Sequence, residues 1–298
     1  MRASGHAPNE VSILSWAFGL LGVRNLALCQ LLARSVRPRL DKFSLQELHL
    51  LTWGFVALDM KGAELFQAIA DDLVVRFDAK SRRLWGLRAE ARADFVEHAT
   101  GIIWVFNFAE VLQEPLLMSA RQTLASIGRY LDAASISPKA TPLATSLRGW
   151  RPDDRPYVAL ECSDRVVVHK PPGWEVDDQA VDKTIDMGRR LSTYLRSALP
   201  SALGPIMCDA KHQLGFLHRL DVPSSGLIAV ALTYEAYYDL TLQLCAGQFS
   251  RDYTVLCHGY VPLDLCELRA RLSWKGKSLT LAIRTGRPSR TNMNVLLP

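Results

Sequence analysis

Apolar side chains recur at helical spacing through the first 134 residues of the chain, and few stretches there show the strict alternation typical of strands. From residue 158 the pattern changes to short apolar runs bounded by turn residues. The segment between them loses the periodicity and carries four prolines among Ser and Thr, as linkers do. The pattern therefore predicts an all-α helical-repeat domain over 1–134, a linker over 135–157 and an α+β domain over 158–298.

A tryptophan-centred motif repeats within the helical part. Leu-Ser-Trp-Ala-Phe around Trp16 returns 37 residues later as Leu-Thr-Trp-Gly-Phe around Trp53, and a looser copy surrounds Trp104. A period of this length predicts helix pairs that stack in an α-solenoid, with Trp16 and Trp53 in equivalent buried places. A plain helical bundle would use the three tryptophans as core anchors in the same way. A second amphipathic segment follows each copy: Leu26–Val36, Ala63–Val75 and Leu116–Leu131.

The period and the Trp-Ala-Phe signature resemble the octotricopeptide-like repeats of organellar RNA-binding proteins over about two and a half units. That resemblance implies that residues 1–134 bind RNA. The alternative is that these helices have a purely structural role.

The C-terminal part is predicted to alternate strands with a few helices. A strand over Asp164–Lys170 should stop at the turn Pro171–Trp174, because Pro and Gly favour turns. The other expected elements are helices over Thr184–Leu199 and Tyr234–Cys245 and strands over Leu227–Leu232, Tyr253–Gly259, Cys266–Ser273, Ser278–Ile283 and Arg290–Leu296.

Three short motifs occur in order along this domain: Lys-Pro-Pro-Gly ending at Gly173, His-Arg-Leu-Asp-x-x-Ser-Ser-Gly-Leu over 218–227, and Arg-x-Tyr ending at Tyr253. Together they resemble the RluA-type RNA pseudouridine synthases, whose central signature is HRLDxxTSGL. Here Ser224 replaces Thr, and Arg251 replaces the Lys of a KxY element. The resemblance implies a mixed, mostly antiparallel sheet and uridine in ribosomal or transfer RNA as substrate.

The chemistry of that family explains a carboxylate in the central motif. Converting uridine to pseudouridine breaks a carbon–nitrogen glycosidic bond and forms a carbon–carbon bond to the same sugar. A carboxylate near the ribose can act as nucleophile or base, and Asp is ionised at neutral pH because its unperturbed pKa is ~3.9. Asp221 is therefore the expected catalytic residue.

The resemblance also implies roles for the neighbouring residues. Tyr253 would stack on the flipped base and assist removal of its C5 proton. Arg219 would hold a phosphate or fill the space that the base leaves, and Arg251, His218 and Ser225 are the other expected RNA-binding residues. His218 is expected to serve as a structural hydrogen-bonding residue, and Tyr253 could instead be part of the core.

Two other enzyme classes are excluded by what surrounds these residues. His-Arg-Leu-Asp resembles the kinase catalytic loop, but the chain has no glycine-rich phosphate loop and no Asp-Phe-Gly after it. A serine hydrolase using Ser224 or Ser225 would need a GxSxG elbow, which the sequence lacks.

Charge and cysteine content limit the partners and cofactors. The net charge of +5 is spread evenly, with 19 basic and 16 acidic residues before residue 158, so it permits an RNA partner without proving one. The six cysteines form no CxxC pair, and the isomerisation is redox-neutral, so neither a metal nor a cofactor is expected. No apolar run reaches the ~20 residues of a membrane helix, so no membrane partner is expected either. The protein is expected to act as a monomer.

Both ends of the chain lead to expectations about a longer protein. Helical sequence begins within ten residues of Met1, so the natural start of the protein is expected upstream. The protein is expected inside the cell, with the chloroplast and the mitochondrion among the possible compartments. Family members carry a late TGRxHQIR block, from which Pro288–Thr291 departs, so the chain is expected to end before it. The 298-residue chain alone should then have little activity, and the alternative function is a non-catalytic RNA-binding or scaffold protein with a degenerate synthase domain.

Overall fold

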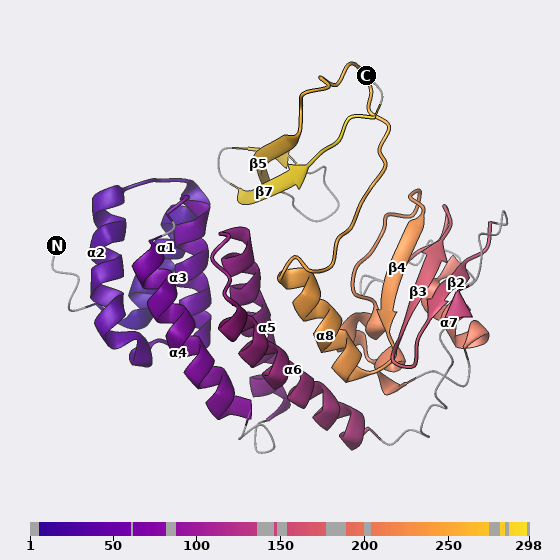
Figure 1. Ribbon diagram of the computed structural model, residues 1–298, viewed down its shortest axis with the longest axis horizontal. Helices are drawn as coiled ribbons and strands as arrows, with labels where there is room; N and C mark the ends of the chain where they lie inside the picture. The colour runs from indigo at the N-terminus through magenta and orange to yellow at the C-terminus, as the bar shows by residue number, and fades with distance from the viewer. Residues whose placement is uncertain are drawn as a thin grey trace. The chain divides into compact units, whose positions relative to one another are not determined.

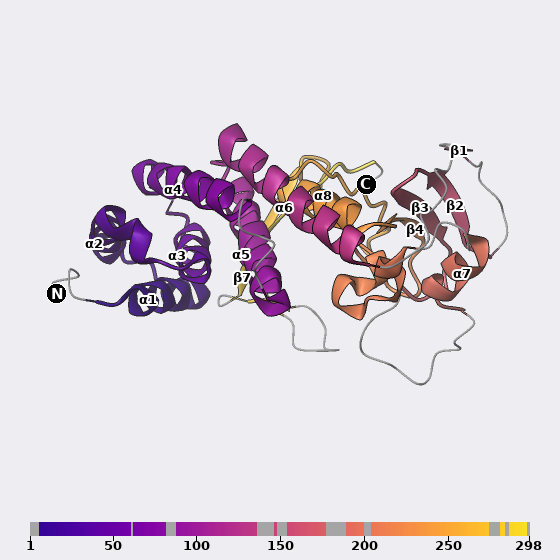
Figure 2. The same cartoon turned by 90° about the horizontal axis from the view of Figure 1, so that it is seen from below.

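The fold is that of a computed structural model, whose elements are drawn in Figure 1 and, turned by 90°, in Figure 2. It has helices in the N-terminal half and antiparallel sheets in the C-terminal half. The structure describes residues 6–60, 62–81, 88–135, 146–147, 154–176, 189–199, 204–273, 281–283 and 286–296.

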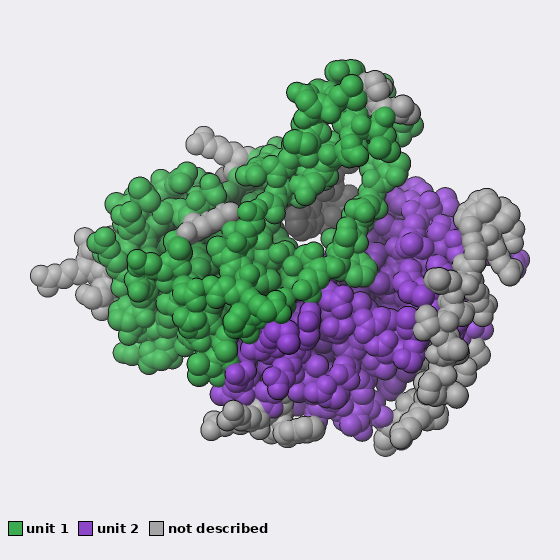
Figure 3. Space-filling view, viewed as in Figure 1, with its two compact units in different colours: residues 1–76, 93–117, 245–298 green, residues 77–92, 118–244 purple. Residues whose placement is uncertain are grey.

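The chain forms two compact units, which Figure 3 distinguishes by colour. Unit 1 comprises residues 1–76, 93–117 and 245–298, and unit 2 comprises residues 77–92 and 118–244. These units do not coincide with the expected domains 1–134 and 158–298, whose boundaries stay a prediction.

In the part of the chain that the structure describes, six α-helices precede strand β1, and their bounds follow the apolar periodicity. Helix starts are marked by caps: the Ser44 side chain accepts from the backbone N–H of Glu47, whose own side chain accepts from the Ser44 N–H. Because the apolar positions fall on one helical stripe, residues such as Leu48, Leu51 and Phe55 are buried together. The helices are α1 (Pro8–Leu21), α2 (Leu26–Val36), α3 (Leu45–Ala57), α4 (Ala63–Ser81), α5 (Ala89–Phe108) and α6 (Glu114–Ala134), with the 3-10 helix η2 (Arg37–Lys42) after α2.

Helices α1 and α3, which carry the first two copies of the motif, pack directly on each other within unit 1. Gly19 and Gly54 face each other there, and the Ser15 hydroxyl donates a hydrogen bond to the Leu51 carbonyl at 3.1 Å. The predicted burial was wrong for Trp16, which is 38% exposed, whereas Trp53 is half-buried, so the two tryptophans do not occupy equivalent places. The physical reason is that two backbones in such close contact leave no room for an indole, so the rings lie at the rim of the contact.

The close contact leads to a prediction for Gly54→Ala. A Cβ atom at Gly54 would lie 2.3 Å from the Ser15 carbonyl oxygen, which belongs to the backbone and cannot rotate away. We expect a loss of about 2 kcal/mol of unfolding free energy despite the higher helix propensity of Ala. Urea unfolding monitored by circular dichroism measures it. Gly62→Ala is the control, because a Cβ there meets nothing within 4 Å; equal midpoints for both variants would contradict the packing.

A histidine pair lies between α3 and α5 in unit 1. The His49 and His98 rings are 5.7 Å apart, and the His49 ring lies where a Cβ on Gly101 would be. Burial, and secondly the charge of His98, lowers the pKa of His49 to about 4. His49 is therefore neutral in the folded protein at pH 7.

This depressed pKa predicts a pH-dependent stability. Between the ordinary pKa near 6.5 and the folded value near 4, the unfolded chain binds more protons, so stability must fall as the pH falls through this window. We expect the His49 contribution to be on the order of 2 kcal/mol. Unfolding midpoints measured from pH 7 to pH 4 should fall less steeply in His49→Gln than in the wild type. Parallel profiles would contradict the assignment.

The larger sheet belongs to unit 2 and has the order β1-β2-β3-β4, with every pairing antiparallel. Strand β3 has alternate residues buried, and Lys170 occupies the last core-facing position of that alternation. Strand β1 lies inside the expected linker, so the linker supplies an edge strand of this sheet. The strands are β1 (Ser146–Leu147), β2 (Tyr157–Glu161), β3 (Arg165–Lys170) and β4 (Gly226–Ala231).

Unit 2 also contains α7 (Leu191–Ala198), the 3-10 helices η5 (Pro205–Cys208) and η6 (Ala210–Gly215), and α8 (Tyr234–Cys245) except its last residue. The expected helix over 184–199 is thus observed from Leu191, and residues 184–188 lie outside the described part. The bounds of α8 agree with the prediction.

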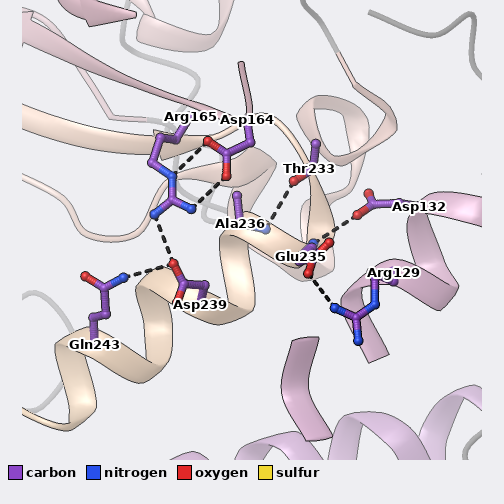
Figure 4. A network of polar contacts seen from close by, with 9 residues as sticks. All are labelled: Arg129, Asp132, Asp164, Arg165, Thr233, Glu235, Ala236, Asp239 and Gln243. Carbon is purple, nitrogen blue, oxygen red and sulfur yellow. Dashed lines mark hydrogen bonds and ion pairs between the residues drawn. The ribbon is translucent and has the colours of Figure 1, made fainter. Parts of the chain in front are cut away.

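Ion pairs connect α8 to β3 and to the C-terminal part of α6 (Figure 4). Arg165 at the start of β3 binds Asp164 at 2.7 Å and Asp239 of α8 at 3.0 Å. At the other end, the Asp132 carboxylate accepts from the backbone N–H groups of Tyr234 and Glu235 at 2.8 and 3.0 Å. Asp132 therefore caps the N-terminus of α8 although it comes from a different helix.

A smaller sheet in unit 1 has the order β6-β5-β7, with β5 (Glu267–Ser273), β6 (Leu281–Ala282) and β7 (Arg287–Asn292). The strand expected over 253–259 was wrong: these residues are exposed and pair with no strand in the described part of the chain. An isolated strand cannot satisfy its backbone hydrogen bonds, so β-type composition alone does not form one.

Candidate active site

The central motif lies at one edge of the larger sheet. Strands β3 and β4 are antiparallel, and Lys170 at the end of β3 pairs with Gly226 at the start of β4. The turn after β3 and the loop before β4 must therefore lie together. The Gly173 backbone N–H donates to the Val222 carbonyl at 2.8 Å, so two of the three sequence motifs are joined.

Asp221 lies in this loop at the start of a tight turn. Its carbonyl accepts from the Ser224 backbone N–H at 2.9 Å, and its side chain is exposed. Gly226 follows the loop with a φ of +152°, a conformation that L side chains rarely adopt. The turn and the glycine together present the Asp221 carboxylate to solvent at the edge of the sheet.

Lys170 binds the backbone of the loop that carries Asp221 from the core side of the sheet. Its side chain is fully buried, and its ammonium donates to the carbonyls of Pro171 at 3.2 Å, Val222 at 3.1 Å and Ser224 at 2.6 Å. Burial lowers the pKa of Lys170, and the negative charge of Asp221 opposes that shift. Lys170 thus fixes the backbone on which Asp221 lies and places a positive charge near it.

Of the other motif residues of unit 2, His218 contacts the sheet, whereas Arg219 and Ser225 are exposed to solvent. His218 Nε2 accepts from the Ala229 backbone N–H at 3.4 Å, which ties the motif to β4. Arg219 and Ser225 are exposed. Arg219 and Asp221 therefore belong to one exposed loop, and His218 has the kind of backbone contact expected of a structural residue.

Arg251 and Tyr253 belong to unit 1 rather than to unit 2, which carries the Asp221 loop. Both are exposed, and the Tyr253 side chain is 60% accessible. The core alternative for Tyr253 is thus wrong, and its stacking role stays a prediction.

The structure also assigns functions that the sequence pattern did not reveal. Lys170 provides three hydrogen bonds to backbone carbonyls of the motif region, which the Lys-Pro-Pro-Gly motif by itself does not indicate. The feature of the sequence that could have indicated this role is a lysine at a core-facing position of a strand.

Among the described residues, no group of three or more His, Cys, Asp or Glu side chains could hold a metal ion. No helix in the described part of the chain is long and apolar enough to cross a bilayer.

Comparison with known proteins shows what this part of the chain resembles. Residues 164–288 match the family model described as RNA pseudouridylate synthase, so this region is similar to that family. A particular relative is the ribosomal large subunit pseudouridine synthase D of Nitrosomonas europaea, which is 32% identical over 83 residues. That match covers 28% of this chain and 24% of the relative. No solved structure matches the chain.

Proposed function

We propose that the protein containing this chain is an RNA pseudouridine synthase and that Asp221 is its catalytic carboxylate. The observation that carries the proposal is the exposed Asp221 on a loop held from beneath by the buried Lys170. An exposed, oriented carboxylate can reach the ribose of a nucleotide that has left the stack.

The reaction exchanges one bond of the sugar for another. The bond between N1 and C1′ of uridine breaks, the bond between C5 and C1′ forms, the C5 proton is released, and a proton is taken up at N1. Asp221 serves as nucleophile or base toward the sugar. Tyr253 is proposed to stack on the base, which is worth about 1–3 kcal/mol per stacked base. Arg219, Arg251, His218 and Ser225 are proposed to line the path of the RNA.

The substrate is uridine in ribosomal or transfer RNA, and the name of the similar enzyme favours ribosomal RNA. The direct experiment measures tritium released from RNA that carries uridine labelled at C5, using the full-length protein and no added metal or cofactor. Release in proportion to enzyme supports the proposal. Specific RNA binding without release would contradict it.

RNA affinity should depend on salt in this proposal. Each phosphate neutralised by Arg or Lys releases counterions, so a site with several phosphate contacts should lose at least about tenfold in affinity between 50 and 200 mM salt. Fluorescence anisotropy with labelled RNA measures this slope. Binding no tighter than that of an equally charged control protein at low salt would contradict an RNA partner.

A further inference from the structure

The three motif tryptophans line one cavity of about 490 Å³ within unit 1. Trp16 comes from α1, Trp53 from α3 and Trp104 from α5, and Arg287 and Ser289 of β7 line the same space. Its volume falls within the ~300–1,000 Å³ usual for ligand pockets. The residues expected to be core anchors therefore form the walls of an open site.

The indoles are placed for contact with a ligand rather than for packing. Trp16 and Trp104 are 38% and 36% exposed, and Trp104 stacks on Phe108 at 5.2 Å, which orients its ring. Aromatic faces bind planar rings by stacking, and every nucleobase has such a face. His49 also lines the cavity and adds a further planar ring.

The smaller sheet contributes one arginine to the cavity lining, Arg287 of β7. Two other arginines of its strands form ion pairs: Arg269 with Glu267, and Arg290 with Glu267 and Glu110. The Arg271 guanidinium donates to the Ala57 carbonyl at 2.7 Å and to the Gly19 carbonyl, so it joins the sheet to α1 and α3 and completes the cavity. An aromatic pocket with an arginine in its lining matches a planar ring that is linked to a phosphate.

We propose that this cavity binds an unpaired base of the RNA, stacked between the tryptophans, with its phosphate toward Arg287. The base is one other than the uridine that reacts. The inference relies on the proposed function for the identity of the polymer as RNA, and it does not rely on Asp221. A free nucleotide would offer the same chemistry, and the experiment separates the two sources.

The test measures affinity for a fluorescein-labelled single-stranded RNA of about ten nucleotides, and for AMP, in the full-length protein. Replacing Trp16 and Trp104 together by Leu should weaken RNA binding about 5- to 100-fold. The same double change to Phe should restore most of it, because a phenyl ring still stacks. Both side chains are part-exposed, so the fold should survive, and circular dichroism checks this.

A matched pair of charge variants tests the phosphate contact. Arg287→Gln should weaken RNA binding, and Arg269→Gln, which removes the same charge from the same sheet outside the cavity lining, should weaken it less. Unchanged RNA affinity in the folded Leu variant would overturn the proposal. So would a loss confined to AMP, because the occupant would then be a free nucleotide.

The two proposals can fail separately. If the protein releases tritium and the Leu variant binds RNA normally, the cavity proposal fails and the synthase proposal stands. If no tritium is released but the Leu variant loses RNA binding, the synthase proposal fails and the cavity proposal stands.

Discussion

Asp221→Asn should reduce tritium release from C5-labelled uridine by at least about a thousandfold and leave RNA affinity nearly unchanged. Asparagine keeps the shape of the side chain but cannot act as nucleophile or base. The Asp221 side chain is exposed, and the turn depends on its backbone carbonyl, so the substitution should not disturb the loop. A chemical role predicts loss of turnover without loss of binding.

The control for this variant is Asp154→Asn, which changes another exposed carboxylate of the same unit. It should release tritium at the wild-type rate. Equal release by the wild type and Asp221→Asn would remove Asp221 from the mechanism. A large loss of RNA affinity in Asp221→Asn would instead indicate a binding role.

Lys170→Met should destabilise the protein by about 3 kcal/mol and slow the reaction as well. Methionine fills similar space but donates no hydrogen bond, so the carbonyls of Val222 and Ser224 would lose their buried donor. The loop would then hold Asp221 less firmly, and the nearby positive charge would be lost. Urea unfolding and single-turnover tritium release measure the two effects.

A second lysine variant separates the local effect of Lys170 from a general loss of charge. Lys211→Met, at an exposed position of the same unit, should change neither the stability nor the rate of tritium release. An unfolding midpoint equal to that of the wild type in Lys170→Met would contradict the hydrogen bonds.

The sequence predicted those elements whose own residues carry a complete signal. Helix α8 begins after Thr233, whose hydroxyl accepts from the Ala236 N–H, and ends close to Gly247, and its bounds were predicted correctly. Strand β4 was predicted within one residue because its apolar run has turn residues on one side. The Asp221 motif was recognised because its spacing is specific to a family.

The failures concern features that depend on distant partners. The burial of Trp16 depends on how closely Gly19 approaches Gly54, and the local sequence pattern around Trp16 does not predict that distance. Residues 253–259 have strand-like composition, but a strand also requires a neighbour to pair with. The cavity likewise depends on the smaller sheet meeting helices that precede it by more than 150 residues in the chain.

The cap that Asp132 places on α8 determines where this protein can be divided. By sequence, Asp132 belongs to the helical half, yet its carboxylate caps the first turn of α8, which lies in the region similar to the synthases, and Arg129 adds an ion pair to Glu235. In a fragment that begins at the proline-rich segment, the backbone N–H groups of Tyr234 and Glu235 at the start of α8 would lose the Asp132 carboxylate as their acceptor. A recombinant fragment that contains α8 must therefore also contain Arg129 and Asp132, and any exchange of the helical half between proteins must leave this end of α6 behind.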